Sequence, residues 1–346
     1  MLIHLRLYAE IMRAILVAAV LATALCAVTL QAAGAGPLED GIAAYQHGEY
    51  YTALKLLRPA AEQGSADAQL ALGMMYHDGE GVVQDYGQAM RWLRKAADQG
   101  NLEAQGGIGT MYLGGEGVPQ DDAQAAHWMQ KPAEAGQPYA EAVMGELADK
   151  HGDYAQALKW LRSGADHGGA GAQSDLGHMY EVGHGVPQDY AQAMKYYQLA
   201  ANQGVATAQY NIGILYDTGH GVAQDAAQAA KWYRLAAEQG DSDAQYNLAV
   251  LYDNGRGLDK DKGEAAKWFR RAAEQGVAGA QNNLGAMYAN GEGVPQDFVQ
   301  AYKWFALSAA QGNPPAVRNR DIIAKRLTPD QLAQAKKLVQ AWAPKT

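Results

Sequence analysis

A period of 36 residues is the feature that most constrains the fold of this chain. A helix-ending signature, such as AAEQG or AADQG, recurs along almost its whole length. Its final glycines are Gly64, Gly100, Gly136, Gly168, Gly204, Gly240, Gly276 and Gly312. The successive intervals are 36, 36, 32, 36, 36, 36 and 36 residues. A repeated unit of this length buries its apolar face only by stacking on its neighbours, so the sequence predicts a repeat array.

Each period is typical of a hairpin of two helices. In residues 205–240, Ala208, Ile212 and Leu215 follow helical spacing in the first half, which we name helix A. The glycines of the TGHG segment then end that helix, and a second apolar stripe that includes Tyr233 forms helix B. Alanine is abundant while Val and Ile are sparse, which favours helices over strands. We therefore expect an all-α fold.

Small and large residues recur at fixed positions of the period. The small ones in helix A are Ala68, Ala104, Ala140, Ala172, Ala208, Ala244, Ala280 and Ala316, with Gly73, Gly109, Gly145, Gly177, Gly213 and Gly285 further along and Ala249 as the exception. The large ones are Tyr76, Tyr112, Tyr180, Tyr216, Tyr252 and Tyr288 in helix A, and Trp92, Trp128, Trp160, Trp232, Trp268 and Trp304 in helix B, with Tyr196 replacing one. A glycine inside a helix costs about 1 kcal/mol relative to alanine, so we expect close helix–helix packing to offset it. The glycines are predicted to face the large aromatic residues in a continuous core.

Acidic residues at the start of helix B follow the pattern of N-terminal caps. The pairs are Asp85/Gln88, Asp121/Gln124, Asp153/Gln156, Asp189/Gln192, Asp225/Gln228, Asp261/Glu264 and Asp297/Gln300. A capping box satisfies the free N–H groups of a helix start with these side chains. Seven pairs in one register indicate caps rather than acid–base sites.

The consensus AQxxLGxMYxxGxGVxQDxxQAxxWxxxAAxQG resembles the Sel-one-like repeat family, which is related to tetratricopeptide repeats. The resemblance covers residues 37–327. It implies a right-handed alpha-solenoid of stacked helix-turn-helix repeats of about 36 residues that serves as an adaptor for other proteins. The expected organisation is eight repeats over residues 37–312, with short units at 37–64 and 137–168, and C-terminal capping helices over 313–346.

Two further segments depart from the repeat. Pro132 lies late in a helix B, where a proline removes a backbone hydrogen bond and clashes with the preceding turn. We expect a kink and a change of curvature around residues 130–150, which is either a hinge or a tolerated local distortion. Near the C-terminus, Thr328 followed by Pro329 and Gln331 predicts a capping box at the start of a last helix.

The N-terminus has the pattern of a secretory signal peptide. Residues 14–30 form an apolar run of 17, preceded by Arg13 and followed by small residues. We expect residues 1–33 to be a cleaved signal, with cleavage after Ala33 or Ala35, and a periplasmic or secreted product of Gram-negative type. An uncleaved anchor is the alternative, and the start codon is open between Met1 and Met12.

The single cysteine and the net charge narrow the classes of partner and chemistry. Cys26 lies inside the signal segment, so the mature chain has no disulfide, thiolate site or cysteine nucleophile. The formal charge of the full chain is -9. Loss of Arg6, Arg13 and Glu10 with the signal leaves 26 of the 28 basic and 36 of the 37 acidic residues. This acidic balance argues against nucleic acid as a partner, and we expect a monomer that meets a membrane only through its signal segment.

Motifs for catalysis, cofactors and metals do not stand out. The sequence has no G-x-S-x-G, S-x-x-K, H-E-x-x-H or paired C-x-x-C motif. His184 and His220 occupy the loop position between two glycines, where other repeats carry Glu or Arg; this indicates a solvent-facing position, and no third metal ligand is evident. We therefore expect no enzyme activity, no cofactor and no metal.

A surface strip is the best candidate site in the sequence. Hairpin solenoids line their concave face with helix A residues, and the positions after the recurrent helix A glutamine vary between repeats. The candidate peptide-binding residues are Tyr210, Asn211, Tyr246, Asn247, Asn282 and Asn283. Tyr and Asn offer aromatic contact and amide hydrogen bonds to an extended peptide, although the same residues could be structural.

Two function classes remain from the sequence. The first is a non-enzymatic exported scaffold that mediates protein–protein interaction. The second is a cell-envelope, peptidoglycan-related binding factor or a hydrolase of beta-lactamase-like type, because some cysteine-rich relatives of the repeat family are described in that way. This chain lacks their cysteine pairs and any serine nucleophile motif, so the resemblance does not carry that activity over.

Overall fold

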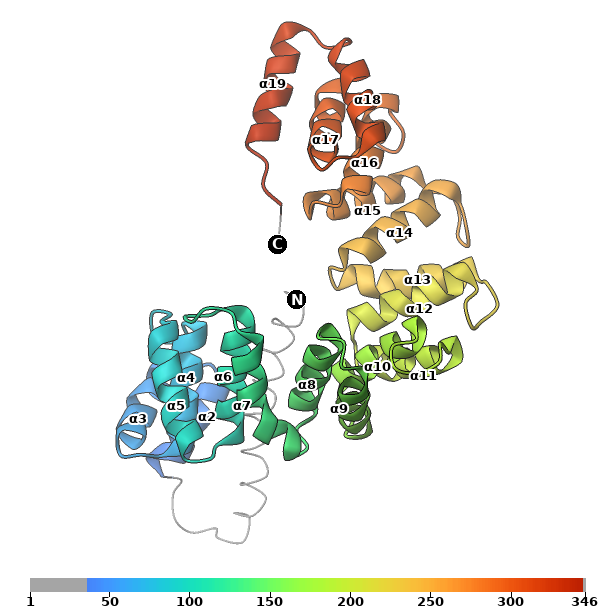
Figure 1. Cartoon of the computed structure of the whole chain (residues 1–346). Coiled ribbons are helices and arrows are strands. Elements are labelled where there is room, and N and C mark those ends of the chain that lie inside the picture. Colours follow the sequence, from blue (N-terminus) through green and yellow to red (C-terminus); the bar gives the residue numbers. More distant parts are fainter. Residues whose placement is uncertain (1–35, 345–346) are drawn as a thin grey trace. The chain divides into compact units, whose positions relative to one another are not determined.

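The computed structural model describes residues 36–344, which form 18 α-helices and no strand (Figure 1). The chain divides into two compact units, which meet between Ala172 and Gln173. We name the described parts unit 1 (36–172) and unit 2 (173–344). The helices of unit 1 are α2 (Pro37–Gln46), α3 (Tyr50–Glu62), α4 (Ala66–Asp78), α5 (Tyr86–Asp98), α6 (Leu102–Gly114), α7 (Asp122–Glu134), α8 (Pro138–Lys150) and α9 (Tyr154–Asp166).

Unit 2 begins inside α10 (Ala170–Val182) and continues the same pattern to the C-terminus. Its other helices are α11 (Tyr190–Asn202), α12 (Ala206–Thr218), α13 (Ala226–Glu238), α14 (Ser242–Asn254), α15 (Lys262–Glu274), α16 (Ala278–Asn290), α17 (Phe298–Ala310), α18 (Pro314–Ala324) and α19 (Pro329–Gln340). Most of these helices are 13 residues long, which is three to four turns.

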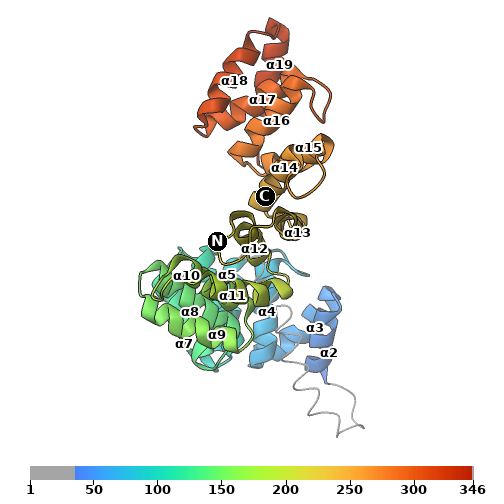
Figure 2. The ribbon, with the colours of Figure 1, turned by 90° about the vertical axis from the view of Figure 1, so that its right-hand side faces the viewer.

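Within each unit, every helix packs mainly on the helices before and after it in the sequence. This holds from α2 to α8 in unit 1 and from α11 to α17 in unit 2, and Figures 1 and 2 show the resulting rows of helix pairs. Contacts between neighbours in sequence are the defining property of a solenoid. The predicted all-α fold of stacked helix-turn-helix repeats is confirmed.

The helix A glycines allow close helix packing, as predicted, but their partner is not the tryptophan. A Cβ added at Gly73 would lie 2.7 Å from the Leu93 side chain, and one at Gly213 would lie 2.6 Å from the Tyr233 ring. The same contact joins Gly109 to Met129, Gly145 to Leu161, Gly177 to Tyr197 and Gly285 to Phe305. The large side chain that packs against each helix A glycine therefore belongs to the residue directly after the Trp position.

The tryptophans lie at the edge of the core rather than at its centre. Trp268 and Trp304 are buried, whereas Trp92, Trp128, Trp160 and Trp232 are only partly buried. A basic side chain lies over several of these rings, as at Lys95 on Trp92. Helix B buries the next residue more deeply, so these four tryptophans pack against the core from its edge and do not face the helix A glycines as predicted.

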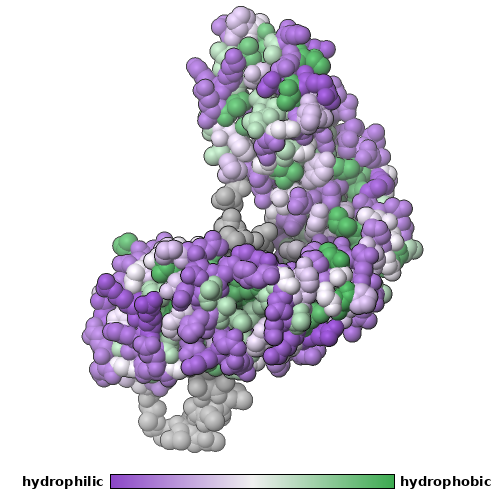
Figure 3. All heavy atoms as spheres, in the orientation of Figure 1, coloured by the Kyte–Doolittle hydropathy of each residue, from purple (hydrophilic) through white to green (hydrophobic). Residues whose placement is uncertain are grey.

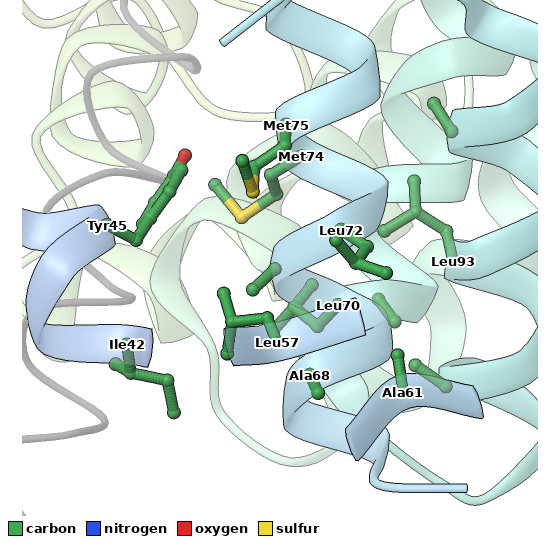
Figure 4. Packing of buried hydrophobic residues seen from close by; sticks show 14 of the residues in the cluster. Ile42, Tyr45, Leu57, Ala61, Ala68, Leu70, Leu72, Met74, Met75 and Leu93 are labelled. Atoms are coloured by element: carbon green, nitrogen blue, oxygen red, sulfur yellow. The ribbon is translucent and has the colours of Figure 1, made fainter. Parts of the chain in front are cut away.

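Small residues fill the core of unit 1 together with aliphatic side chains (Figure 4). Leu57 from α3 and Leu72 and Met75 from α4 are fully buried beside Ala68. All eight recurrent alanines of helix A have no exposed surface. On the face seen in Figure 3, hydrophilic residues cover most of the surface of each unit.

The aspartates at the start of helix B are caps, as predicted, but only half of each capping box forms as expected. All seven aspartates accept a hydrogen bond from a backbone N–H of the first turn, as Asp225 does from Gln228 at 3.0 Å. The backbone N–H of Asp225 donates to the Tyr216 carbonyl at 2.9 Å instead of to a glutamine side chain. The same bond to the helix A tyrosine recurs at Asp85, Asp121, Asp189, Asp261 and Asp297. At Thr328 and Gln331 both halves of the box are present, as predicted.

The departures from the repeat have clear structural counterparts. Helix α7 continues through Pro132, which is buried; the kink remains a prediction. In the short repeat, α8 and α9 are joined by a turn of three residues. At the C-terminus, α19 packs on α17, and Trp342 lies against the unit 2 core.

Between residues 36 and 344, no helix is long and apolar enough to span a bilayer. The expected signal segment, residues 1–33, lies outside the described residues.

Candidate functional site

The predicted strip lies on three successive A helices of unit 2. Tyr210 and Asn211 are on α12, Tyr246 and Asn247 on α14, and the asparagine pair on α16. All six side chains are partly exposed. The repeat therefore brings them to one register on successive helices, as the sequence predicts.

The two tyrosines of the strip also contribute to packing. The Tyr210 ring lies 5.8 Å from the Tyr233 ring, and the Tyr246 ring lies 5.8 Å from the Phe269 ring. The Tyr246 ring also covers Gly279 at the start of α16, where an added Cβ would lie 3.1 Å from it. Each ring thus presents one edge to solvent while the rest packs between neighbouring helices.

The asparagines use part of their hydrogen-bonding capacity inside the protein. Burial raises the pKa of the Tyr210 hydroxyl, and the neighbouring Asn247 side chain opposes that rise. Burial also raises the pKa of Tyr197, and Asn211 opposes it there. On α16, Asn282 accepts a hydrogen bond from Asn319 at 3.2 Å and donates one to Asn283 at 3.3 Å.

The strip can bind by contact and hydrogen bonding, and it carries no group suited to acid–base chemistry. An amide side chain has two donor and two acceptor positions, so each asparagine keeps capacity for a ligand backbone. Burial raises the pKa of the Tyr210 phenol, so this group is harder to ionise than usual. The arrangement suits recognition of a polypeptide more than catalysis.

The sequence reasoning missed a ladder of buried glutamines that joins the repeats. In helix A, Gln245 donates to the carbonyl of Ala237, at 3.1 Å, in the preceding helix B. Gln275, at the end of its own repeat, donates to the Gln245 side chain at 2.9 Å. We call this arrangement the glutamine ladder. Its other pairs are Gln69 with Gln99, Gln173 with Gln203, Gln209 with Gln239 and Gln281 with Gln311. The signal was in the sequence, as five pairs of glutamines 30 residues apart; Gln105 lacks such a partner because residue 135 is alanine.

The short repeat replaces the ladder with charged and titratable groups. Glu141 stands where the other repeats have the buried glutamine, and it is 1% exposed. It accepts hydrogen bonds from Ser163 at 2.6 Å and from His167 at 2.8 Å. Glu141 and His167 therefore connect the helices from the same positions of the repeat as the paired glutamines do, through a carboxylate and an imidazole instead of two amides.

The loop residue between two glycines, which we call the slot residue, contacts the preceding repeat. Glu80 accepts a hydrogen bond from the Tyr50 hydroxyl at 2.8 Å and is 9% exposed. The His220 ring stacks on Tyr190 with centroids 4.7 Å apart. Arg256 pairs with Asp217, and Glu292 pairs with Lys262 at 2.8 Å.

The prediction of a solvent-facing slot is therefore wrong at Glu80 and incomplete at His220. The slot accepts different residues because its partner in the preceding repeat changes with it. Among residues 36–344, no cluster of three or more His, Cys, Asp or Glu side chains is placed to bind a metal.

His77 is part of the same kind of contact. Its Nε2 lies 2.7 Å from the slot residue Glu116 and its Nδ1 lies 2.7 Å from Asp78. Burial by itself lowers the pKa of His77, but the hydrogen bonds to these two carboxylates outweigh it and raise the pKa to about 9. The imidazolium is thus the form that joins the two repeats at neutral pH.

The repeat geometry has a clear match among known families. The Sel1 repeat model matches residues 41–65, 66–101, 102–137, 144–169, 170–205, 206–241, 242–277 and 278–313. This chain belongs to the Sel1 repeat family. Members of the family are typically scaffolds for protein–protein interaction and are generally non-catalytic.

Two solved structures show the same fold. A Sel1 repeat protein from Oxalobacter formigenes is 35% identical over 81% of this chain and 85% of its own, with a TM-score of 0.60. A protective antigen present in uropathogenic Escherichia coli strains, described as displaying an SLR fold, is 31% identical over 88% of this chain and 82% of its own, with a TM-score of 0.53. No curated protein matches this chain.

Proposed function

We propose that this Sel1 repeat protein is a non-enzymatic, exported scaffold that binds a segment of a partner protein at the strip on α12, α14 and α16. The observation that carries the proposal is the repetition of partly exposed Tyr and Asn side chains in one register on three successive A helices. Aromatic rings and amides at regular spacing match the side chains and backbone of an extended peptide.

The family supports the same function in a broader form. Sel1 repeat proteins are typically interaction scaffolds. A partner that lies along the strip would contact several repeats at once, so binding energy would accumulate along the array.

Export is the second part of the proposal, and it rests on the N-terminal sequence. The apolar run over residues 14–30 and the small residues after it have the pattern of a signal peptide. Expression of the full precursor followed by N-terminal sequencing of the periplasmic fraction should give a mature protein that starts at Gly34 or Gly36. Retention of residues 1–30 on a membrane-bound product would contradict cleavage.

Capture of a partner from an envelope extract tests the strip. The mature chain is immobilised, and the proteins that it retains are compared with those retained by a variant with Asn211, Asn247 and Asn283 replaced by alanine. We expect the variant to lose the specific partner, because the amides that would bind its backbone are gone.

The control must separate binding from folding, because Asn211 and Asn247 lie beside buried tyrosine hydroxyls. Lys231 and Glu238 on α13 are exposed, so their replacement by alanine should leave capture intact. The melting temperature of each variant is measured in parallel. If the alanine variant is unstable, replacement of the same asparagines by glutamine moves each amide by one methylene and should still weaken capture. A partner retained equally by folded variants of both kinds would refute the strip.

A further inference from the structure

The Gly-x-Gly loops have a second structural role besides ending helix A. In five of the six loops, the second glycine packs against the first residues of helix B in the preceding repeat. A Cβ added at Gly81 would lie 2.8 Å from the Tyr50 Cβ, and one at Gly117 would lie 2.5 Å from the Tyr86 Cβ. The same contact is made by Gly221 on Tyr190, Gly257 on Ala226 and Gly293 on Lys262. In these five cases a loop from the next repeat covers the start of a helix B.

The residue after the second glycine completes this cover with an apolar side chain. Val82 and Val118 are partly buried against the core of unit 1. Val222, Leu258 and Val294 pack in the same manner against the cores of unit 2. A Gly-x-Gly-apolar segment is therefore the part of each loop that fits the start of the preceding helix B.

The start of α7 lacks this cover, because the following repeat is four residues shorter. Helix α8 ends at Lys150 and α9 begins at Tyr154, so the segment that would reach back to α7 is missing. An open pocket of about 620 Å³ occupies this place. Its lining includes Asp122, Ala123, Ala126, Leu147, Lys150 and His151.

At this place α7 exposes part of an alanine. Ala126 is partly exposed, as is Met194 at the same position of α11, whereas Met90 and Ala230 are 7% and 5% exposed. The carboxylate of Asp122, at the helix start, pairs with Lys150 at 2.5 Å and lies 3.5 Å from His151. Lys150 and His151 thus contact the start of helix B where a slot residue does so in other repeats. They leave Ala123 exposed and Ala126 partly exposed.

We propose that this pocket is a docking site for a Gly-x-Gly-apolar loop supplied by a partner protein. The occupant follows from the chain itself, because five starts of helix B in this protein are covered by such a segment in cis. Ala123, Ala126 and Leu147 form the floor for the apolar residue. Lys150 and His151 lie at the rim with more than half of each side chain exposed, at 55% and 62%. The site lies in unit 1, so it stands independently of the strip in unit 2.

The second glycine of the partner loop is the specific requirement. In the cis loops this residue has a positive φ, such as 70° at Gly117, and its Cα faces the helix backbone. A side chain at that position would be strained by the backbone conformation and would also clash with the helix start. A matched peptide in which this glycine is replaced by valine therefore should not bind.

Methyl NMR of the mature protein tests the site directly with a synthetic peptide. The probe is Gly-Glu-Gly-Val-Pro-Gln, which is the sequence of residues 115–120. We expect saturable shifts of the Ala123, Ala126 and Leu147 methyl signals. The methyl groups of Ala227 and Ala230 are the internal control, since Gly257 and its loop already cover that helix start.

Two variants show whether binding occurs in the pocket. Replacement of His151–Gly152 by Gly-Glu-Gly-Val-Pro-Gln restores the four missing residues and should abolish the shifts, because the loop then fills the pocket in cis. If that variant does not fold, Ala126→Met, which introduces the residue found at Met90, should weaken binding by partly filling the floor. Absence of saturable shifts, equal shifts at Ala227 and Ala230, equal binding of the valine peptide, or unchanged binding to a folded filled variant would each overturn the proposal.

Discussion

At the scale of single residues, glycine has two separate uses in this protein. Inside helix A, Gly73 and its equivalents leave room for a large side chain of helix B. In the loops, Gly81 and its equivalents adopt a positive φ and contact the preceding helix B. In helix A, close packing compensates for the low helix propensity of glycine. In the loops, glycine is needed because the backbone has a positive φ. The two kinds of position should therefore tolerate mutation differently.

Two glycines that face the same leucine allow a matched prediction. A Cβ at Gly73 would lie 2.7 Å from the Leu93 side chain, whereas one at Gly107 would lie 3.5 Å from it. We expect Gly73→Ala to destabilise the protein by about 1–3 kcal/mol, because overpacking outweighs the gain in helix propensity. Gly107→Ala should be neutral or stabilising by up to about 1 kcal/mol. Urea unfolding of both variants measures the difference, and equal effects would contradict the packing argument.

The contact between His77 and Glu116 gives a pH-dependent prediction. The folded-state pKa of His77 is raised to about 9 from the ordinary histidine value of 6.5. The stabilisation is therefore complete below about pH 6.5 and is lost as the pH rises through about 9.

Unfolding free energies of the wild type and of His77→Gln should thus converge between pH 7 and about 10. His127, an exposed histidine on α7, provides the control substitution. A pH-independent difference between wild type and His77→Gln would show that the ring acts only by packing.

At the scale of elements, the connections between helices are as regular as the helices themselves. Buried alanines set the helix spacing, aspartate caps start seven of the B helices, and the glutamine ladder ties a helix A to the helix B on either side. In the short repeat Glu141 and His167 replace the glutamine pair. The elements are thus held in register by polar bonds in addition to apolar contact.

Removal of one ladder glutamine should be costly. Gln245→Leu removes the hydrogen bonds to the Ala237 carbonyl and from the Gln275 amide, although each of these groups keeps a second bond to the Gly240 backbone. A hydrogen bond within a protein contributes about 0.5–1.5 kcal/mol, so we expect destabilisation of about 1–3 kcal/mol for the two bonds together. Gln198→Leu on α11 makes the same chemical change at an exposed position and should be near neutral. Thermal unfolding of the two variants compares them; similar stabilities would exclude an energetic role for the ladder.

Much of the element-level structure could be predicted because it repeats in one dimension. The period, the helix hairpins, the aspartate caps and the close packing at the helix A glycines could all be predicted from residues that recur at a fixed spacing. The helix B residue that packs against each helix A glycine could not be identified from the sequence. Trp92 and Leu93 are adjacent, and only the rotation of the helix about its axis decides which of them faces Gly73. The slot contacts and the pocket beside α7 were also missed, since they depend on which residues of different repeats meet. For the strip, the sequence placed the six residues on one register, but their internal contacts with Tyr197 and Asn319 required the structure.

At the scale of the whole molecule, stability is expected to be local. Contacts join helices that are neighbours in sequence, and the chain separates into two compact units. In a repeat array of this kind, each repeat is stabilised by itself and by its nearest neighbours. A perturbation in one unit should therefore decay along the chain.

Hydrogen exchange can measure this decay. In Gly73→Ala, amides of α4, α5 and α6 should lose protection, while those of α14 to α17 should exchange as in the wild type. Ala249→Gly is the reciprocal variant, because it lies at the equivalent position in unit 2 and should loosen α14 and α15 instead. Loss of protection throughout both units in either variant would show that the protein unfolds as one cooperative block.

The backward contact of each Gly-x-Gly loop gives the array a direction. Because a loop covers the helix B of the repeat before it, the five repeats covered in this way are completed by sequence that lies further towards the C-terminus. When such a repeat emerges from the ribosome, the start of its helix B stays uncovered until the next loop has been made. The earlier repeats can be complete while translation continues.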